Sequence, residues 1–186
     1  MPKVIGIVGY HNSGKTTLAC ALARALIARG YRVAAVKHLS HYADLPGKDT
    51  ALLAEAAGQV GFISPEGAGI FWKEPLSLEE VISHLEADIV LVEGFKGQQT
   101  FPKIVCLRGQ PDDADEADEY IRCIRDLFDE WVIGAVGPAG QVEGIEVPVF
   151  GPHEVDKIAD LVEREETLAK VAKNLRKGDG TSSNGG

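Results

Sequence analysis

The length, composition and charge of this chain exclude several classes of protein. Its 186 residues are enough for one domain with a substantial core, and 45% of them are hydrophobic, which is typical of a folded domain. The net charge of -9, from 19 basic and 28 acidic side chains, argues against a general nucleic-acid or anionic-membrane binder. We find neither a charged, apolar leader nor about 18 uninterrupted apolar residues, and therefore expect a cytoplasmic protein with no membrane partner.

Hydrophobic patterning predicts strands and helices that alternate along the chain. The apolar run over 3–8 predicts a buried strand, a helix should follow from about Lys15 to Arg29, and 32–37 predicts a second strand. The later elements are expected in this order: a helix from Lys48 to about Gly58, a hairpin from 60–64 and 69–73, a helix after the capping box of Ser77 and Glu80, strands over 88–92, 103–108, 131–136 and 147–150, and a helix from Val155. This order indicates an α/β fold, a mainly parallel sheet with helices on both faces and an added β-hairpin. We expect a single domain over 1–177 and a disordered polar tail over 178–186.

The three cysteines are far apart in the sequence and none forms a CxxC pair. Neither a disulfide framework nor a zinc site is therefore expected. Cys20 lies in a helical pattern and Cys106 in a strand pattern, which favours buried, unreactive thiols at both positions.

The stretch GYHNSGKT, from Gly9 to Thr16, lies between the first predicted strand and the first predicted helix. Two glycines separated by four residues and followed by Lys and Thr form the phosphate-binding loop of P-loop NTPases, in which backbone amides and a helix N-terminus face an anion. Lys15 would contact the β- and γ-phosphates, and the Thr16 hydroxyl would ligate Mg²⁺. The predicted nucleotide-binding loop comprises Gly9, Tyr10, His11, Asn12, Ser13, Gly14, Lys15, Thr16 and Thr17.

A second acidic group is expected at the end of a neighbouring buried strand, because Mg²⁺ needs hard oxygen ligands. Glu93, which closes the apolar run DIVLV, is the best candidate, and with Lys15 it is the predicted catalytic residue. Asp44 could also approach the metal and Asp49 the nucleotide, although capping of a helix or loop explains such residues equally well. The histidines at 38 and 41 indicate a loop that covers the nucleotide more than a metal pair. The guanine-reading motif NKxD is absent, so the residues alone do not give the base preference.

Three segments, GYHNSGKTTL, VKHLSHYADLPGKDT and DIVLVEGFKGQQTFPKIVCLR, together resemble the MobB family of molybdopterin-guanine dinucleotide biosynthesis adaptor proteins. The resemblance covers roughly the first 108 residues, and neither the acidic stretch from Asp112 nor VGPAGQ from Val136 belongs to it. It implies a protein that binds GTP and Mg²⁺, with at most weak GTPase activity. Lys37, His38 and Asp49 would join the nucleotide loop in binding this ligand.

The resemblance also implies partners. The protein would assist the molybdopterin guanylyltransferase, which joins GMP to molybdopterin, and it would form a homodimer. Apolar residues of the predicted hairpin could supply the dimer contact, although core packing explains them equally well: Phe62, Ile63, Ile70, Phe71 and Trp72.

Two other functions remain open from the sequence. One is a small-molecule kinase or ATP-dependent ligase of similar architecture, in which the γ-phosphate passes to a bound acceptor. The other is a non-catalytic adaptor that binds molybdopterin through Lys37, His38 and Lys96, with the nucleotide only stabilising its shape.

Overall fold

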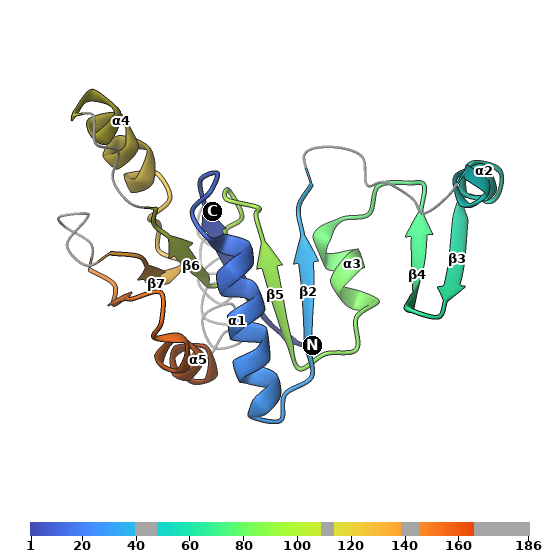
Figure 1. Ribbon diagram of the computed structural model, residues 1–186, viewed down its shortest axis with the longest axis horizontal. Coiled ribbons are helices and arrows are strands. Elements are labelled where there is room, and N and C mark those ends of the chain that lie inside the picture. Colours follow the sequence, from blue (N-terminus) through green and yellow to red (C-terminus); the bar gives the residue numbers. More distant parts are fainter. Residues whose placement is uncertain (40–47, 109–113, 139–145, 166–186) are drawn as a thin grey trace, which may run out of the picture. The chain divides into compact units, whose positions relative to one another are not determined.

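A six-stranded parallel sheet forms the centre of the larger of two compact units, which comprises residues 1–38 and 86 onward; residues 39–85 form the other. The computed structural model of the chain describes residues 1–39, 48–108, 114–138 and 146–165 (Figure 1). In spatial order the strands of the sheet are β2 (Val33–Lys37), β5 (Ile89–Glu93), β1 (Lys3–Gly9), β6 (Lys103–Cys106), β7 (Val132–Val136) and β8 (Val149–Phe150). The helices of this unit are α1 (Lys15–Ala28), α4 (Ala114–Arg125) and α5 (Val155–Arg164). The predicted α/β fold with a parallel sheet is therefore confirmed.

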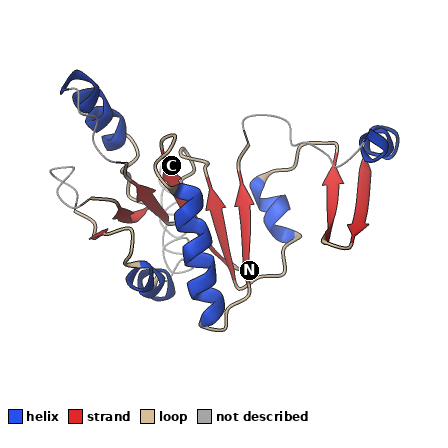
Figure 2. Ribbon diagram, viewed as in Figure 1, coloured by secondary structure: helices blue, strands red, loops and turns tan. Residues whose placement is uncertain are grey.

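Helices α1 and α5 cover one face of this sheet, and Figure 2 shows α1 running across it. Leu18, Leu22 and Leu26 recur every four residues on α1, so they lie on one side of the helix, where they are buried. They pack against the buried strand residues Ile5 and Ile7. Each fully buried side chain of this kind stabilises the fold by about 1.5–3 kcal/mol, and this cluster fixes the start of α1 above the end of β1.

Helix α4 belongs to a second apolar cluster, which contains Tyr120, Ile124, Val105 and Val132. The N-terminal half of α4 is rich in acidic residues, and its apolar residues Tyr120 and Ile124 lie in its C-terminal half. The described part of the acidic stretch, from residue 114 onward, therefore lies in this helix.

The smaller unit contains a hairpin with its own two-stranded sheet. Its elements are α2 (Lys48–Ala57), β3 (Gln59–Ser64), β4 (Gly67–Trp72) and α3 (Leu78–Ser83). The predicted hairpin is present, but within the described part of the chain its strands pair with each other and not with the parallel sheet. The predicted capping box is confirmed at α3, where the Glu80 amide donates to the Ser77 hydroxyl (3.2 Å) and the Ser77 amide to the Glu80 carboxylate (2.8 Å).

The other expectations from the sequence differ in their outcome. Cys106 is buried as predicted, but Cys20 is exposed, because it lies on the outer side of α1. The tail over 178–186 lies outside the described residues, and the single domain over 1–177 stays a prediction. None of the helices in the described part of the chain has the length and apolar character needed to cross a membrane.

Candidate nucleotide-binding site

The candidate site lies where the chain leaves β1, at the carboxyl end of the parallel sheet. Helix α1 follows β1 onto one face, whereas α4 follows the neighbouring strand β6 onto the other. The helices after β1 and β6 therefore lie on opposite faces of the sheet, and ligands of open α/β sheets bind in the crevice at such a switch point.

Backbone geometry shapes the predicted phosphate loop into a cradle. Asn12 (φ +58°) and Gly14 (φ +83°) adopt left-handed conformations, which turn the chain into α1. At Gly9 (φ +156°) a Cβ atom would lie 2.6 Å from the carbonyl oxygen of Cys106 and would collide with the hydroxyl of Ser13. The Ser13 hydroxyl is buried and has no hydrogen-bond partner among the described residues. Such an orphaned donor beside free amides at a helix start fits an anionic ligand.

Lys15 is held within the loop itself. Its ammonium nitrogen donates a hydrogen bond of 2.6 Å to the carbonyl oxygen of Tyr10. The Tyr10 hydroxyl in turn donates to the carbonyl oxygen of Cys123 on α4 (3.0 Å), so the loop is anchored on its far side. The lysine thus lies across the mouth of the cradle, where a phosphate group would replace the carbonyl as its partner.

Thr16 and Glu93, the two residues that the sequence predicts as ligands of one metal ion, are in direct contact. The Thr16 hydroxyl lies 3.0 and 2.9 Å from the two carboxylate oxygens of Glu93. Lys37 pairs with the same carboxylate at 3.3 Å, because the parallel register sets Lys37 beside Glu93. Two hard oxygen donors next to a phosphate cradle fit Mg²⁺, which takes few protein ligands and completes its shell with phosphate oxygens and water. The ion would offset charge on the phosphates.

A cavity of about 380 Å³ opens beside the loop, on the side of α1. This volume falls in the range of small-molecule sites. Its lining residues come from the phosphate loop, α1 and the ends of β6 and β7: Asn12, Ser13, Gly14, Thr17, Leu18, Ala21, Cys106, Leu107, Arg108, Val136, Gly137, Pro138 and Pro152. The cavity therefore adjoins the phosphate cradle and is of the right size for a nucleoside.

The turn after β5 brings His38 to the site. Gly94 (φ +101°) and Phe95 (φ +52°) both lie in the left-handed region, and a side chain at Gly94 would meet His38 Cβ at 2.8 Å. The rings of His38 and Phe95 are in contact, with centroids 4.5 Å apart. His38 thus supports the turn that follows Glu93, and the histidine itself is exposed.

The remaining predicted residues do not join Lys15, Thr16 and Glu93 among the described contacts of the site. Asp44 lies outside the described residues. Asp49 is exposed in the first turn of α2, in the smaller unit, where its charge suits the helix N-terminus. His11 lines a second cavity of about 420 Å³ together with Tyr10, Arg108, Tyr120 and other residues of α4. Arg108 lines both cavities and was not predicted, because an arginine after a strand carries no distinguishing local signal.

The fold and the site define a phosphate-loop nucleotide-binding protein of the α/β class. Within that class, the chain belongs to the family whose model is described as "Molybdopterin guanine dinucleotide synthesis protein B", MobB, which matches residues 4–126. The family inferred from three sequence segments is therefore confirmed.

Individual relatives agree with this assignment. A molybdopterin-guanine dinucleotide biosynthesis adapter protein of Haemophilus influenzae is 38% identical over 130 residues, which cover 65% of this chain and 72% of the relative. The adapter protein of Escherichia coli is 30% identical over 172 residues, which cover 87% and 92% of the two chains. The crystal structure of Bacillus subtilis MobB matches with a TM-score of 0.64 at 21% identity and covers 88% of this chain and 99% of that one. This last likeness supports the fold.

Proposed function

We propose that this protein is a GTP-binding accessory protein in the synthesis of molybdopterin guanine dinucleotide. The observation that carries the proposal is the cradle formed by the phosphate loop, with the Thr16 hydroxyl and the Glu93 carboxylate in contact beside Lys15, in a chain of the MobB family. Adapter proteins of this family are named for the pathway in which they act. The nucleotide would bind with Mg²⁺.

Each residue of the proposed site has a distinct task. The loop amides and Lys15 bind the phosphates, and Thr16 with Glu93 holds the metal ion. Lys37 balances the charge of Glu93, to which it is paired. Glu93 is also the candidate to orient an attacking water, but Thr16 and Lys37 already engage its carboxylate. Hydrolysis is therefore expected to be weak.

The proposed partners follow from the family. The protein would assist the molybdopterin guanylyltransferase, and molybdopterin itself is a proposed ligand. The exposed face of the hairpin supports a homodimer, because Ile63 and Ile70 lie there as 92% and 61% exposed side chains. The cytoplasm is the proposed location.

The kinase or ligase reading is less well supported. A kinase or ligase would transfer the γ-phosphate rapidly to a bound acceptor. The relatives, in contrast, are named as adapter proteins of one biosynthetic pathway. The pterin adaptor reading requires Lys37 and His38 to bind a cofactor, but Lys37 is paired with Glu93 and the His38 ring with Phe95.

A titration of GTP and ATP, each with and without Mg²⁺, tests the proposal. We expect GTP to bind at least tenfold more tightly than ATP, a difference of about 1.4 kcal/mol, and to require Mg²⁺ for full affinity. Lys15→Ala should abolish binding and leave the circular dichroism spectrum unchanged, since the lysine contacts only a loop carbonyl. Equal affinity for both nucleotides would refute the guanine preference, and tight binding by Lys15→Ala would refute the site.

A further inference from the structure

The loop between β5 and β6 carries a lysine that reaches the phosphate loop. The ammonium nitrogen of Lys96 lies 3.9 Å from the ring centroid of Tyr10, while that of Lys15 is bonded to the Tyr10 carbonyl. Figure 1 shows the loop after β5 beside the loop that precedes α1, at the same end of the sheet. We propose that Lys96 is a second cation for the terminal phosphate of a nucleoside triphosphate, an inference that rests on the proposed nucleotide function.

The charges around Lys96 favour an anion at this place. Partial desolvation, and then the charge of Lys15, lowers the pKa of Lys96. Lys37 has the Glu93 carboxylate as its partner, but no carboxylate of the described residues forms an ion pair with Lys96. A phosphate between the ammonium groups of Lys15 and Lys96 would replace their repulsion by two attractive, charge-assisted contacts.

The backbone before Lys96 is held in an unfavourable conformation that directs the lysine back to the site. Phe95 has a positive φ, which is costly for a large side chain. Three contacts fix the turn: the Gly94 amide donates to the Ile7 carbonyl (3.1 Å), the Gln98 amide to the Phe95 carbonyl (2.9 Å), and the Phe95 ring packs on His38. Such strain persists where the surrounding structure and the function both require one geometry.

The main chain of Lys96 is fixed more firmly than its side chain. The fully buried ammonium group of Lys103 lies 3.4 Å from the Lys96 carbonyl oxygen and 2.5 Å from the Asp129 carboxylate. The Lys96 side chain, in contrast, is exposed and rests on the face of Tyr10. A cation–π contact at an exposed site is weaker than a charge-assisted hydrogen bond to phosphate, so the ammonium group is free to move to a ligand.

The position of Lys96 selects the terminal phosphate over the rest of the nucleotide. The cavity of nucleoside size adjoins Thr17, Leu18 and Ala21 of α1. Tyr10, on whose ring Lys96 rests, does not line that cavity; it lines the second cavity, of about 420 Å³. Since a P-loop lysine contacts the β- and γ-phosphates, a cation beside Lys15 that does not line the nucleoside cavity would meet the γ-phosphate.

Comparison of di- and triphosphate binding tests this inference. We would titrate GDP and a non-hydrolysable GTP analogue, with Mg²⁺, into the wild-type chain and the Lys96→Met, Lys96→Arg and Arg24→Met variants. Lys96→Met should weaken binding of the analogue by about tenfold or more and that of GDP by less than about twofold. Lys96→Arg should keep most of the affinity for the analogue, because the positive charge remains.

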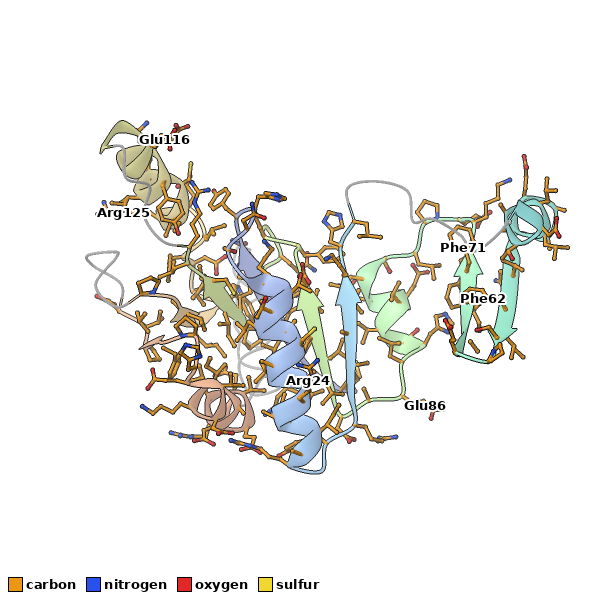
Figure 3. The ribbon with its side chains drawn as sticks, in the orientation of Figure 1. Arg24, Phe62, Phe71, Glu86, Glu116 and Arg125 are labelled. Atoms are coloured by element: carbon orange, nitrogen blue, oxygen red, sulfur yellow. The ribbon has the colours of Figure 1, made fainter. Side chains whose placement is uncertain are left out.

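Arg24→Met is the matched control, since it removes one positive charge from an exposed position of α1 (Figure 3). It should change neither affinity. The inference is overturned if Lys96→Met weakens both nucleotides equally, which would indicate a general effect of charge, or if it changes neither. A wild-type chain that binds GDP but gains nothing from the third phosphate would overturn this inference alone, whereas one that binds neither nucleotide would overturn the proposed function with it.

Discussion

The side chain of Lys103 places a positive charge inside the larger unit, where it is 0% exposed. Its partner Asp129 is 26% exposed and lies at 2.5 Å. Removing one member of a buried ion pair leaves the other charge without a partner in a medium that solvates it poorly, which costs about 3–5 kcal/mol. Because water reaches Asp129 in part, Asp129→Asn should lower the free energy of unfolding by about 3 kcal/mol, the lower end of this range, measured by urea denaturation.

A double variant tests whether the cost arises from the unpaired charge of Lys103 or from the loss of the Asp129 carboxylate itself. Lys103→Met combined with Asp129→Asn removes both charges and keeps a long apolar stem in the core, so it should be more stable than Asp129→Asn alone. Glu130→Gln, an exposed neighbour, serves as the control and should leave stability unchanged. If the double variant is no better than the single one, the cost does not arise from the unpaired ammonium group.

The thiols of Cys106 and Cys20 differ in environment although neither forms a disulfide. Burial raises the pKa of Cys106 to about 12, against the weaker opposing effect of Lys15. Its thiol therefore stays neutral up to strongly alkaline pH, and at pH 8 it should resist iodoacetamide until the protein unfolds. Cys20 is exposed and should react at once. Mass spectrometry measures the labelling, and Cys20→Ser is the control that removes the reactive position. Equal labelling rates at Cys20 and Cys106 in the wild type would contradict the difference in burial.

At the scale of elements, Arg29 joins the end of α1 to α5. Its guanidinium group donates to Asp160 (2.8 Å), to Glu163 (2.7 Å) and to the carbonyl oxygen of Asp156 (3.0 Å). The hydrogen bond with Asp160 is the main reason that the pKa of Arg29 is raised. Arg29→Met should lower the urea midpoint, and the loss should shrink at high salt because screening already weakens these pairs in the wild type.

Arg24→Met is again the matched control, since Arg24 lies on the same helix and is exposed. It should leave the urea midpoint within error of the wild type at both salt concentrations. A salt-independent loss in Arg29→Met would assign its effect to packing of the arginine stem rather than to charge.

Local patterns predicted the elements that depend on neighbouring residues. Apolar runs identified β1 and β5, and the Ser77–Glu80 spacing identified the start of α3, because each of these signals lies within a few residues. The predictions of the phosphate loop and of Glu93 rest on the same kind of local signal, since both follow apolar strands. The sequence did not reveal contacts between distant positions, such as Arg29 with Asp160 or Lys103 with Asp129.

Two differences show where pattern reasoning reaches its limit. The hairpin residues alternate as in any strand, so nothing local decides whether β3 and β4 extend the parallel sheet or pair only with each other. Cys20 follows a helical apolar pattern, but α1 buries only a narrow stripe formed by Leu18, Leu22 and Leu26. The width of a buried stripe depends on what packs against the helix, which the helix sequence does not encode.

At the scale of the whole molecule, the chain is acidic, but several lysines lie close to the phosphate loop. The net charge is -9, yet Lys15, Lys37 and Lys96 lie around the phosphate loop. A polyanionic nucleic acid would meet a repulsive surface, whereas a nucleotide needs only the local field. The charge distribution therefore suits a small phosphorylated ligand.

The exposed apolar face of the hairpin provides a test of whether the protein forms a homodimer. On one of its faces Ile63 is 92% exposed and Ile70 61% exposed, while Phe62 and Phe71, labelled in Figure 3, share the other face. Apolar side chains so fully in water favour a contact that buries them, at about 25 cal/mol for each Å². If a homodimer forms through this face, Ile63→Asp with Ile70→Asp should convert it to a monomer, because two charges cannot be buried there without partners.

Sedimentation equilibrium at micromolar concentration measures this change, and Ile27→Asp is the control. Ile27 is a 55% exposed isoleucine on α1, so its replacement adds a charge to an exposed apolar position of the larger unit and should leave a dimer intact. A wild-type protein that sediments as a monomer would rule out the dimer, and a dimer that survives both hairpin charges would place its interface elsewhere. A monomeric double variant that still binds GTP would show that the nucleotide site needs only one chain.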